Sequence, residues 1–80
     1  MSNLFNKDDD LIKSAPFIGA EILKQLQNSD GNKISIFDLA KSLQKNHKIT
    51  ARSIYYGMIF LYSLDIIEFN EPYLIQNVNN

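Results

Sequence analysis

The sequence predicts a small α+β domain of the winged-helix class: a helix-turn-helix with a short β-hairpin wing, three helices and two to three short strands. Three segments carry apolar residues at helical spacing, two β-branched and aromatic segments follow them, and a turn separates those two segments. The predicted order is helix, short strand, helix, helix, strand, turn, strand. A three-helix bundle with a frayed C-terminus is the alternative that this pattern leaves open.

The first predicted helix begins near Pro16, because the missing N–H of proline would be unpaired at the first helical position anyway. Its apolar residues are Ile18, Ile22, Leu23 and Leu26. A dense group of turn-forming residues at 28–32 ends it. Residues 33–35 are long enough only for a minor strand.

The second predicted helix begins after Ser35, which forms a variant capping box with Asp38 three residues later. Residues 46–48 interrupt its apolar pattern. Thr50 caps a third helix that runs to about Leu64. Segments 66–69 and 73–75 then pair as a hairpin around the turn 70–72.

Eighty residues make one domain at most. We expect a flexible lead-in at 1–13 with a solvated acidic run, the domain at 14–76 and a polar tail at 77–80. The N-terminus lacks the apolar core of a signal peptide, and the longest apolar run, 54–64, is shorter than the ~20 residues that span a bilayer. Together with the absence of Cys, this predicts a soluble cytoplasmic protein without membrane contact.

No catalytic constellation stands out, because the sequence has no Cys, one His and no glycine-rich phosphate loop. His47 lies in a predicted loop among polar residues and is expected to be solvated. We therefore expect no enzymatic activity, no metal and no cofactor. Gly19 and Gly57 lie within predicted helices, where glycine is unfavourable, so we expect a neighbour to pack closely against each.

The net charge is −1, and all eight Lys and Arg lie at or before Arg52. Asp65, Glu68 and Glu71 leave the C-terminal third acidic, and acids in a wing repel phosphate. The third helix, the candidate recognition helix, carries only Arg52 as a base. A DNA-binding regulator is the alternative function, and its candidate residues are Lys41, Lys45, Lys48 and Arg52.

The third predicted helix is apolar on both faces, which favours a protein partner. Ile54, Met58, Leu61 and Leu64 share the face expected in the core. The opposite face supplies the candidate interface residues: Arg52, Tyr55, Tyr56, Ile59 and Phe60. Two alternatives stay open: Tyr56 and Phe60 pack against the first helix or the wing, or the aromatic face pairs with a second copy as a homodimer.

Residues 17–26 (FIGAEILKQL), 36–39 (IFDL) and 60–68 (FLYSLDIIE) resemble segments of the small middle components of bacterial ABC-three-component systems, which include Lamassu-type anti-phage defence. The resemblance covers roughly residues 15–75. Asp65 departs from it, because the family usually has Gly where the third helix ends.

The resemblance implies a non-enzymatic adaptor that links an SMC/Rad50-like coiled-coil ATPase to an effector subunit, often a nuclease. DNA sensing and ATP hydrolysis would then belong to the ATPase. Direct sequence-specific DNA binding by this chain is not expected.

Overall fold

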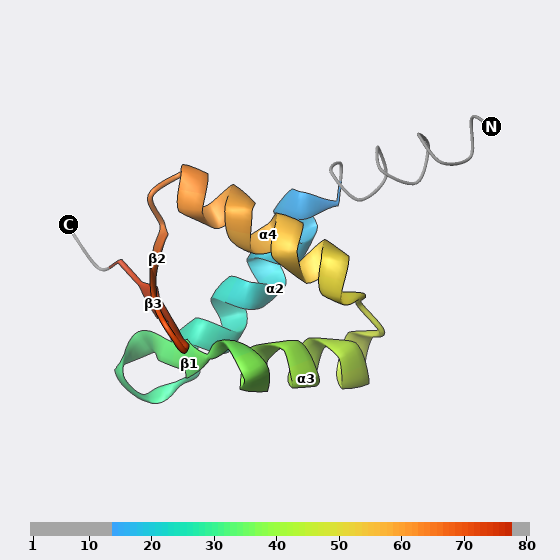
Figure 1. Ribbon diagram of the computed structural model, residues 1–80, viewed down its shortest axis with the longest axis horizontal. Helices are drawn as coiled ribbons and strands as arrows, with labels where there is room; N and C mark the ends of the chain where they lie inside the picture. The colour runs from blue at the N-terminus through green and yellow to red at the C-terminus, as the bar shows by residue number, and fades with distance from the viewer. Residues whose placement is uncertain (1–13, 78–80) are drawn as a thin grey trace.

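Three α-helices and a three-stranded antiparallel sheet make up the part of the chain that the computed structural model describes, residues 14–77 (Figure 1). The predicted α+β class is confirmed, and the three-helix bundle is wrong because residues 67–76 form a paired hairpin. The element order and the sheet are compatible with a winged-helix arrangement. The predicted lead-in at 1–13 and residues 78–80 of the predicted tail lie outside the described residues.

The first helix, α2, spans Ala15–Gln27 and has proline in its first turn, as predicted. A 3-10 turn, η1 (Asp30–Asn32), follows it. Gly31 and Asn32 there have φ angles of 71° and 55°, in the left-handed region that Gly and Asn tolerate best. The chain therefore reverses at this point and enters the sheet.

Both predicted N-cap hydroxyls accept hydrogen bonds, but among the described residues no Asp38 carboxylate oxygen accepts from the Ser35 N–H, so the predicted capping box is only half formed. The Ser35 hydroxyl accepts hydrogen bonds from the backbone N–H groups of Phe37 and Asp38 and begins α3 (Ile36–His47). The Thr50 hydroxyl accepts one from the Ser53 N–H at 3.2 Å and begins α4 (Ala51–Ser63). Each cap pairs a backbone donor that the first helical turn leaves without a partner.

The end of α4 is a Schellman motif. The Asp65 N–H donates to the Tyr62 carbonyl and the Ile66 N–H donates to the Leu61 carbonyl, both at 3.0 Å. Asp65 has a φ angle of 64°, so this position, where the sequence departs from the expected Gly, is in the left-handed region. The prediction that this residue ends the helix is confirmed.

The sheet has the strand order β1-β3-β2, with β1 at Lys33–Ser35, β2 at Ile67–Asn70 and β3 at Tyr73–Gln76. The predicted three-residue turn is wrong, because Asn70 pairs with Tyr73 and only Glu71 and Pro72, joined by a cis peptide bond, connect the strands.

The hairpin also extends beyond the predicted domain boundary at 76. The Asn77 N–H donates to the Ile66 carbonyl at 2.8 Å, and the Asn77 side chain donates to the Asp65 carbonyl at 3.0 Å. Asn77 therefore belongs to the hairpin rather than to a tail.

One core lies between the helices and the sheet. Its members come from all three helices, the turn before α4 and two strands: Ile18, Ile22, Leu26, Leu39, Leu43, Ile49, Ile54, Leu61, Ile67 and Leu74. Met58 packs against this cluster while partly buried. Leu64, predicted to be in the core, is 54% exposed, because it caps α4 and the chain reverses directly after it. Ile66 and Ile67 turn inward instead.

Helices α2 and α4 approach closely through two glycines. A Cβ atom at Gly57 would stand 2.6 Å from the Ile18 Cγ2 atom, and one at Gly19 would stand 3.2 Å from the Cδ2 atoms of Leu61 and Phe60. The predicted close packing at both glycines is confirmed. This contact fixes which face of α4 points inward.

Candidate functional site

The face of α4 opposite Gly57 presents large side chains to solvent. Tyr55, Ile59 and Tyr62 are 56%, 40% and 54% exposed. Their spacing of four and then three residues places them on one line along the helix. We call these three residues the outer stripe. In Figure 1, α4 lies along one edge of the described elements, and α2 lies beside it.

Phe69 of β2 extends the outer stripe beyond the end of the helix. Its ring centroid lies 5.3 Å from that of Tyr62, at an interplanar angle of 44°. At the other end, the ring of Tyr55 meets that of Tyr56 edge-on at 5.9 Å. Two aromatic pairs therefore flank Ile59, one in the first half of α4 and one where α4 meets β2. Exposed apolar residues that gather on one face mark binding sites more often than scattered ones do.

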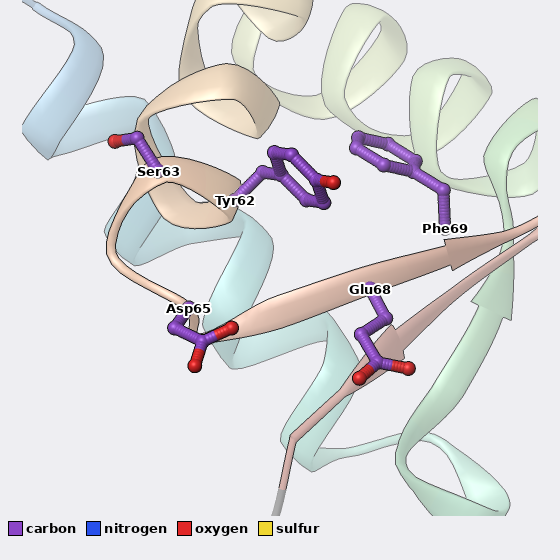
Figure 2. A pocket seen from close by; sticks show the side chains of 5 residues that line it. All are labelled: Tyr62, Ser63, Asp65, Glu68 and Phe69. Atoms are coloured by element: carbon purple, nitrogen blue, oxygen red, sulfur yellow. The ribbon is translucent and has the colours of Figure 1, made fainter.

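A groove of about 610 Å³ lies where α4 meets β2. Its lining residues are Tyr62, Ser63, Asp65, Glu68 and Phe69. Figure 2 shows the rings of Tyr62 and Phe69 beside each other on one side of β2, and the carboxylates of Asp65 and Glu68 on the other side. Neighbouring residues of a strand point to opposite faces, which accounts for this division between Glu68 and Phe69.

The electrostatic character of this end of the molecule is anionic. Asp65 directly follows the C-terminus of α4, where the helix dipole is already negative, and Glu68 lies on β2. The last turn of α4 contains no basic residue. The sequence has no Lys or Arg after Arg52. Neither carboxylate forms an ion pair within residues 14–77. The side of β2 that carries these two carboxylates is therefore anionic.

The structure divides the five predicted interface residues. Arg52, Tyr55 and Ile59 are exposed, and the last two belong to the outer stripe. Tyr56 and Phe60 are only partly exposed, and Phe60 packs against the core and lies next to Gly19 of α2. The contacts of Phe60 therefore favour the alternative in which it packs against the first helix over the prediction that it is an exposed interface residue.

The sequence argument missed Tyr62 and Phe69. Tyr62 could have been found, because residues 52, 55, 59 and 62 repeat at intervals of three, four and three and share one helical face at about 100° per residue. The predicted buried face of this helix was rotated from the observed one. Gly57 lies at the middle of the observed buried face, but it has no side chain and so adds nothing to the hydrophobic pattern. The place of Phe69 on this surface could not be predicted from the sequence, because it depends on β2 lying beside α4.

The four basic candidates for nucleic-acid binding are all exposed. Lys41 and Lys45 lie one turn apart on α3, Lys48 caps the end of that helix, and Arg52 lies in the first turn of α4. They therefore flank the α3–α4 connection, whereas the outer stripe carries aromatic side chains and the hairpin carries exposed Glu68 and Glu71.

Chemistry for catalysis or metal binding is sparse in the described part of the chain. Among residues 14–77, no three His, Cys, Asp or Glu side chains are grouped so as to hold a metal ion. The Nε2 atom of His47 lies 3.6 Å from a carboxylate oxygen of Glu21, which also pairs with Lys24 at 3.4 Å. His47 is the last residue of α3, rather than a loop residue as predicted.

No helix within residues 14–77 combines the length and the apolar character needed to cross a membrane. Comparison with protein-family models, with curated proteins and with solved structures finds no match to this chain.

Proposed function

We propose that this chain is a cytoplasmic, non-enzymatic adaptor with a winged-helix fold that binds partner proteins through the outer stripe of α4. The single observation that carries the proposal is the exposure of Tyr55, Ile59 and Tyr62 on one helical face. Tyrosine and other aromatic residues are enriched where protein interfaces concentrate their binding energy. Phe69 enlarges the same surface beyond the helix.

The winged-helix interpretation strengthens this argument. In that fold the helix before the hairpin is the recognition helix, which here is α4. A recognition helix that reads DNA needs bases for phosphate and polar side chains for base edges. The outer stripe offers three apolar or aromatic side chains instead, and acids follow it. This surface favours a protein partner over a nucleic acid.

The resemblance to the middle components of ABC-three-component systems supplies the proposed partners. The adaptor would connect an SMC/Rad50-like coiled-coil ATPase to an effector, with a nuclease as the leading candidate. It would itself contribute neither ATP hydrolysis nor DNA cleavage. The proposed role is anti-phage defence.

Co-expression of the tagged full chain with an ATPase and an effector encoded beside it tests the proposal. We expect both proteins to co-purify with the chain. The double substitution Tyr55→Ala/Tyr62→Ala should remove at least one of them, because truncating interface anchors weakens binding by roughly 2 kcal/mol or more each. Lys41→Ala, an exposed change on α3, is the matched control. Loss of neither partner in the double variant, with the chain still folded, would contradict the proposed surface.

A DNA-binding regulator remains the second candidate function, favoured by the four exposed bases around the α3–α4 connection. A gel shift at about 150 mM salt separates the two functions, since few phosphate contacts give little affinity at that salt. We expect no shift at micromolar protein. A tight complex that is lost in Lys45→Glu and in Lys48→Glu would favour the regulator.

A further inference from the structure

We propose that the exposed face of α3 binds an acidic segment of a partner protein. Carboxylates of this segment pair with the lysines of α3, and one of its apolar side chains enters a pocket beside Phe37. This inference rests on the proposed adaptor function and gives the adaptor a second binding surface, on a different helix from the outer stripe.

One side of α3 carries a row of exposed side chains at intervals of four, four and three residues: Phe37, Lys41, Lys45 and Lys48. We call these four residues the α3 row. The buried residues of the helix, Leu39 and Leu43, lie on the opposite side. Phe37 is 76% exposed, more than any other large apolar side chain in residues 14–77. The α3 row therefore combines an exposed ring with three cations.

The lysines of the α3 row are available to bind carboxylates. None of them forms an ion pair within residues 14–77. The sequence has no Asp or Glu between Leu39 and Leu64, so no acid in the second half of α3 or in α4 offsets their charge. Lys41 and Lys48 are seven residues apart, which is about 10 Å along a helix. An acidic segment can therefore meet all three cations at once.

A pocket of about 290 Å³ lies at the Phe37 end of the α3 row, and its lining residues are Ile36, Phe37, Glu71 and Pro72. The Ile36 N–H donates to the Pro72 carbonyl at 2.8 Å, which fixes the hairpin turn against the start of α3. The pocket is mainly apolar, whereas a DNA duplex presents phosphates along its outside. Asp38 and Glu71 at this end also repel phosphate. The observations favour an acidic protein segment with an apolar residue over a nucleic acid.

A second copy of this chain fits the α3 row less well. Its acidic segment is the hairpin, where Figure 2 shows the carboxylates of Asp65 and Glu68 on one side of β2 and the ring of Phe69 on the other. The hairpin therefore cannot present its carboxylates and its apolar side chain to one surface together. A segment of a different protein has no such restriction.

Fluorescence anisotropy of two labelled acidic peptides with the full chain, at about 150 mM salt, tests the inference. Both peptides carry glutamates at the spacing of the lysines; one has a leucine where it reaches the pocket, and the other has a serine there. We expect the leucine peptide to bind about tenfold more tightly. The triple substitution Lys41→Glu/Lys45→Glu/Lys48→Glu should weaken both peptides by about thirtyfold, since each exposed ion pair contributes about threefold. Lys41→Ala alone loses about threefold, which is too little to remove a partner in co-purification.

Phe37→Ala should lower the affinity for the leucine peptide to that of the serine peptide and leave the serine peptide unchanged. Phe17→Ala is the matched control, because Phe17 is also exposed, at 62%, but lies on α2. Equal binding of both peptides to the wild-type chain, or the same loss in Phe17→Ala, would refute the pocket. Circular dichroism verifies that each variant remains folded.

Two further outcomes would overturn the choice of partner. A DNA duplex that binds more tightly than either peptide, and equally well to Phe37→Ala, would identify nucleic acid as the occupant. Concentration-dependent dimerisation of the chain alone, with NMR amide shifts along the α3 row, would identify a second copy.

The two proposals fail separately. If neighbouring gene products co-purify equally with wild type, the triple lysine variant and Phe37→Ala, the adaptor function stands and the inference about α3 is wrong. If the peptides show the expected preference but no neighbouring gene product binds, the α3 surface is correct and the proposed adaptor function is wrong.

Discussion

The two faces of α4 have similar apolar character but opposite surroundings. The inner face, centred on Gly57, lies so close to α2 that a single added carbon would meet Ile18 at 2.6 Å. The outer face leaves Tyr55, Ile59 and Tyr62 exposed. Hydrophobicity alone therefore does not tell which face of a helix builds the fold. In α4 the position of glycine identifies the buried face, because the close approach of two helices requires a small residue at the contact.

The largest expected difference between the faces is in stability. Leu61→Ala on the inner face should lower the free energy of unfolding by about 2–5 kcal/mol, because it leaves a cavity in the core. Ile59→Ala on the outer face removes a similar side chain that is already 40% exposed, and should lower it by less than about 1 kcal/mol. Urea unfolding followed by circular dichroism measures both. Equal losses would mean that the outer stripe is part of the core.

The two glycines of the α2–α4 contact sharpen the comparison. Gly57→Ala should destabilise by about 1–3 kcal/mol although alanine favours helices, because the new methyl group meets the β-branched, buried Ile18. Gly19→Ala should change stability by no more than about 1 kcal/mol, because the side-chain atoms of Leu61 and Phe60 at 3.2 Å need to shift by only a few tenths of an ångström and alanine favours the helix. Thermal unfolding of both variants tests this. A stabilised Gly57→Ala variant would show that the helices are not in contact there.

The smallest expected effect lies at the end of α4. Asp65→Gly should stabilise the fold by about 0.5–1 kcal/mol, because glycine adopts the left-handed conformation without steric penalty. Asp65→Asn is the control, since it removes the charge beside the helix C-terminus but keeps a side chain. If Asn raises the unfolding midpoint as much as Gly does, charge rather than backbone conformation limits stability at this position.

Local features were predictable from the sequence because they depend on few neighbours. Ser35, Thr50 and Pro16 place the starts of the helices within a residue or so, and the β-branched segment at 66–69 identifies a strand. Asp65 ends α4 as the family resemblance indicated. In each case the residue's own hydrogen bonding or backbone preference determines the outcome.

Features that depend on distant segments were not predictable in the same way. The pairing of β1 with β3 joins residues far apart in the chain, and nothing in residues 33–35 encodes that partner. How far the Phe60 side chain is buried depends on its contact with Gly19, which lies on another helix. The predicted interface residues accordingly lie on the helix that carries the outer stripe, but they include the partly buried Tyr56 and Phe60 and omit the exposed Tyr62.

The strand order has a consequence for how this chain acquires its fold. β3 comes last in sequence among the described elements, yet it lies at the centre of the sheet and supplies the pairing for both β1 and β2. During synthesis, β1 and β2 therefore emerge from the ribosome with no strand to pair with, and only the helices can form before Tyr73–Gln76 is available. Until then β1 and β2 expose unpaired backbone groups that neighbouring nascent chains can bind.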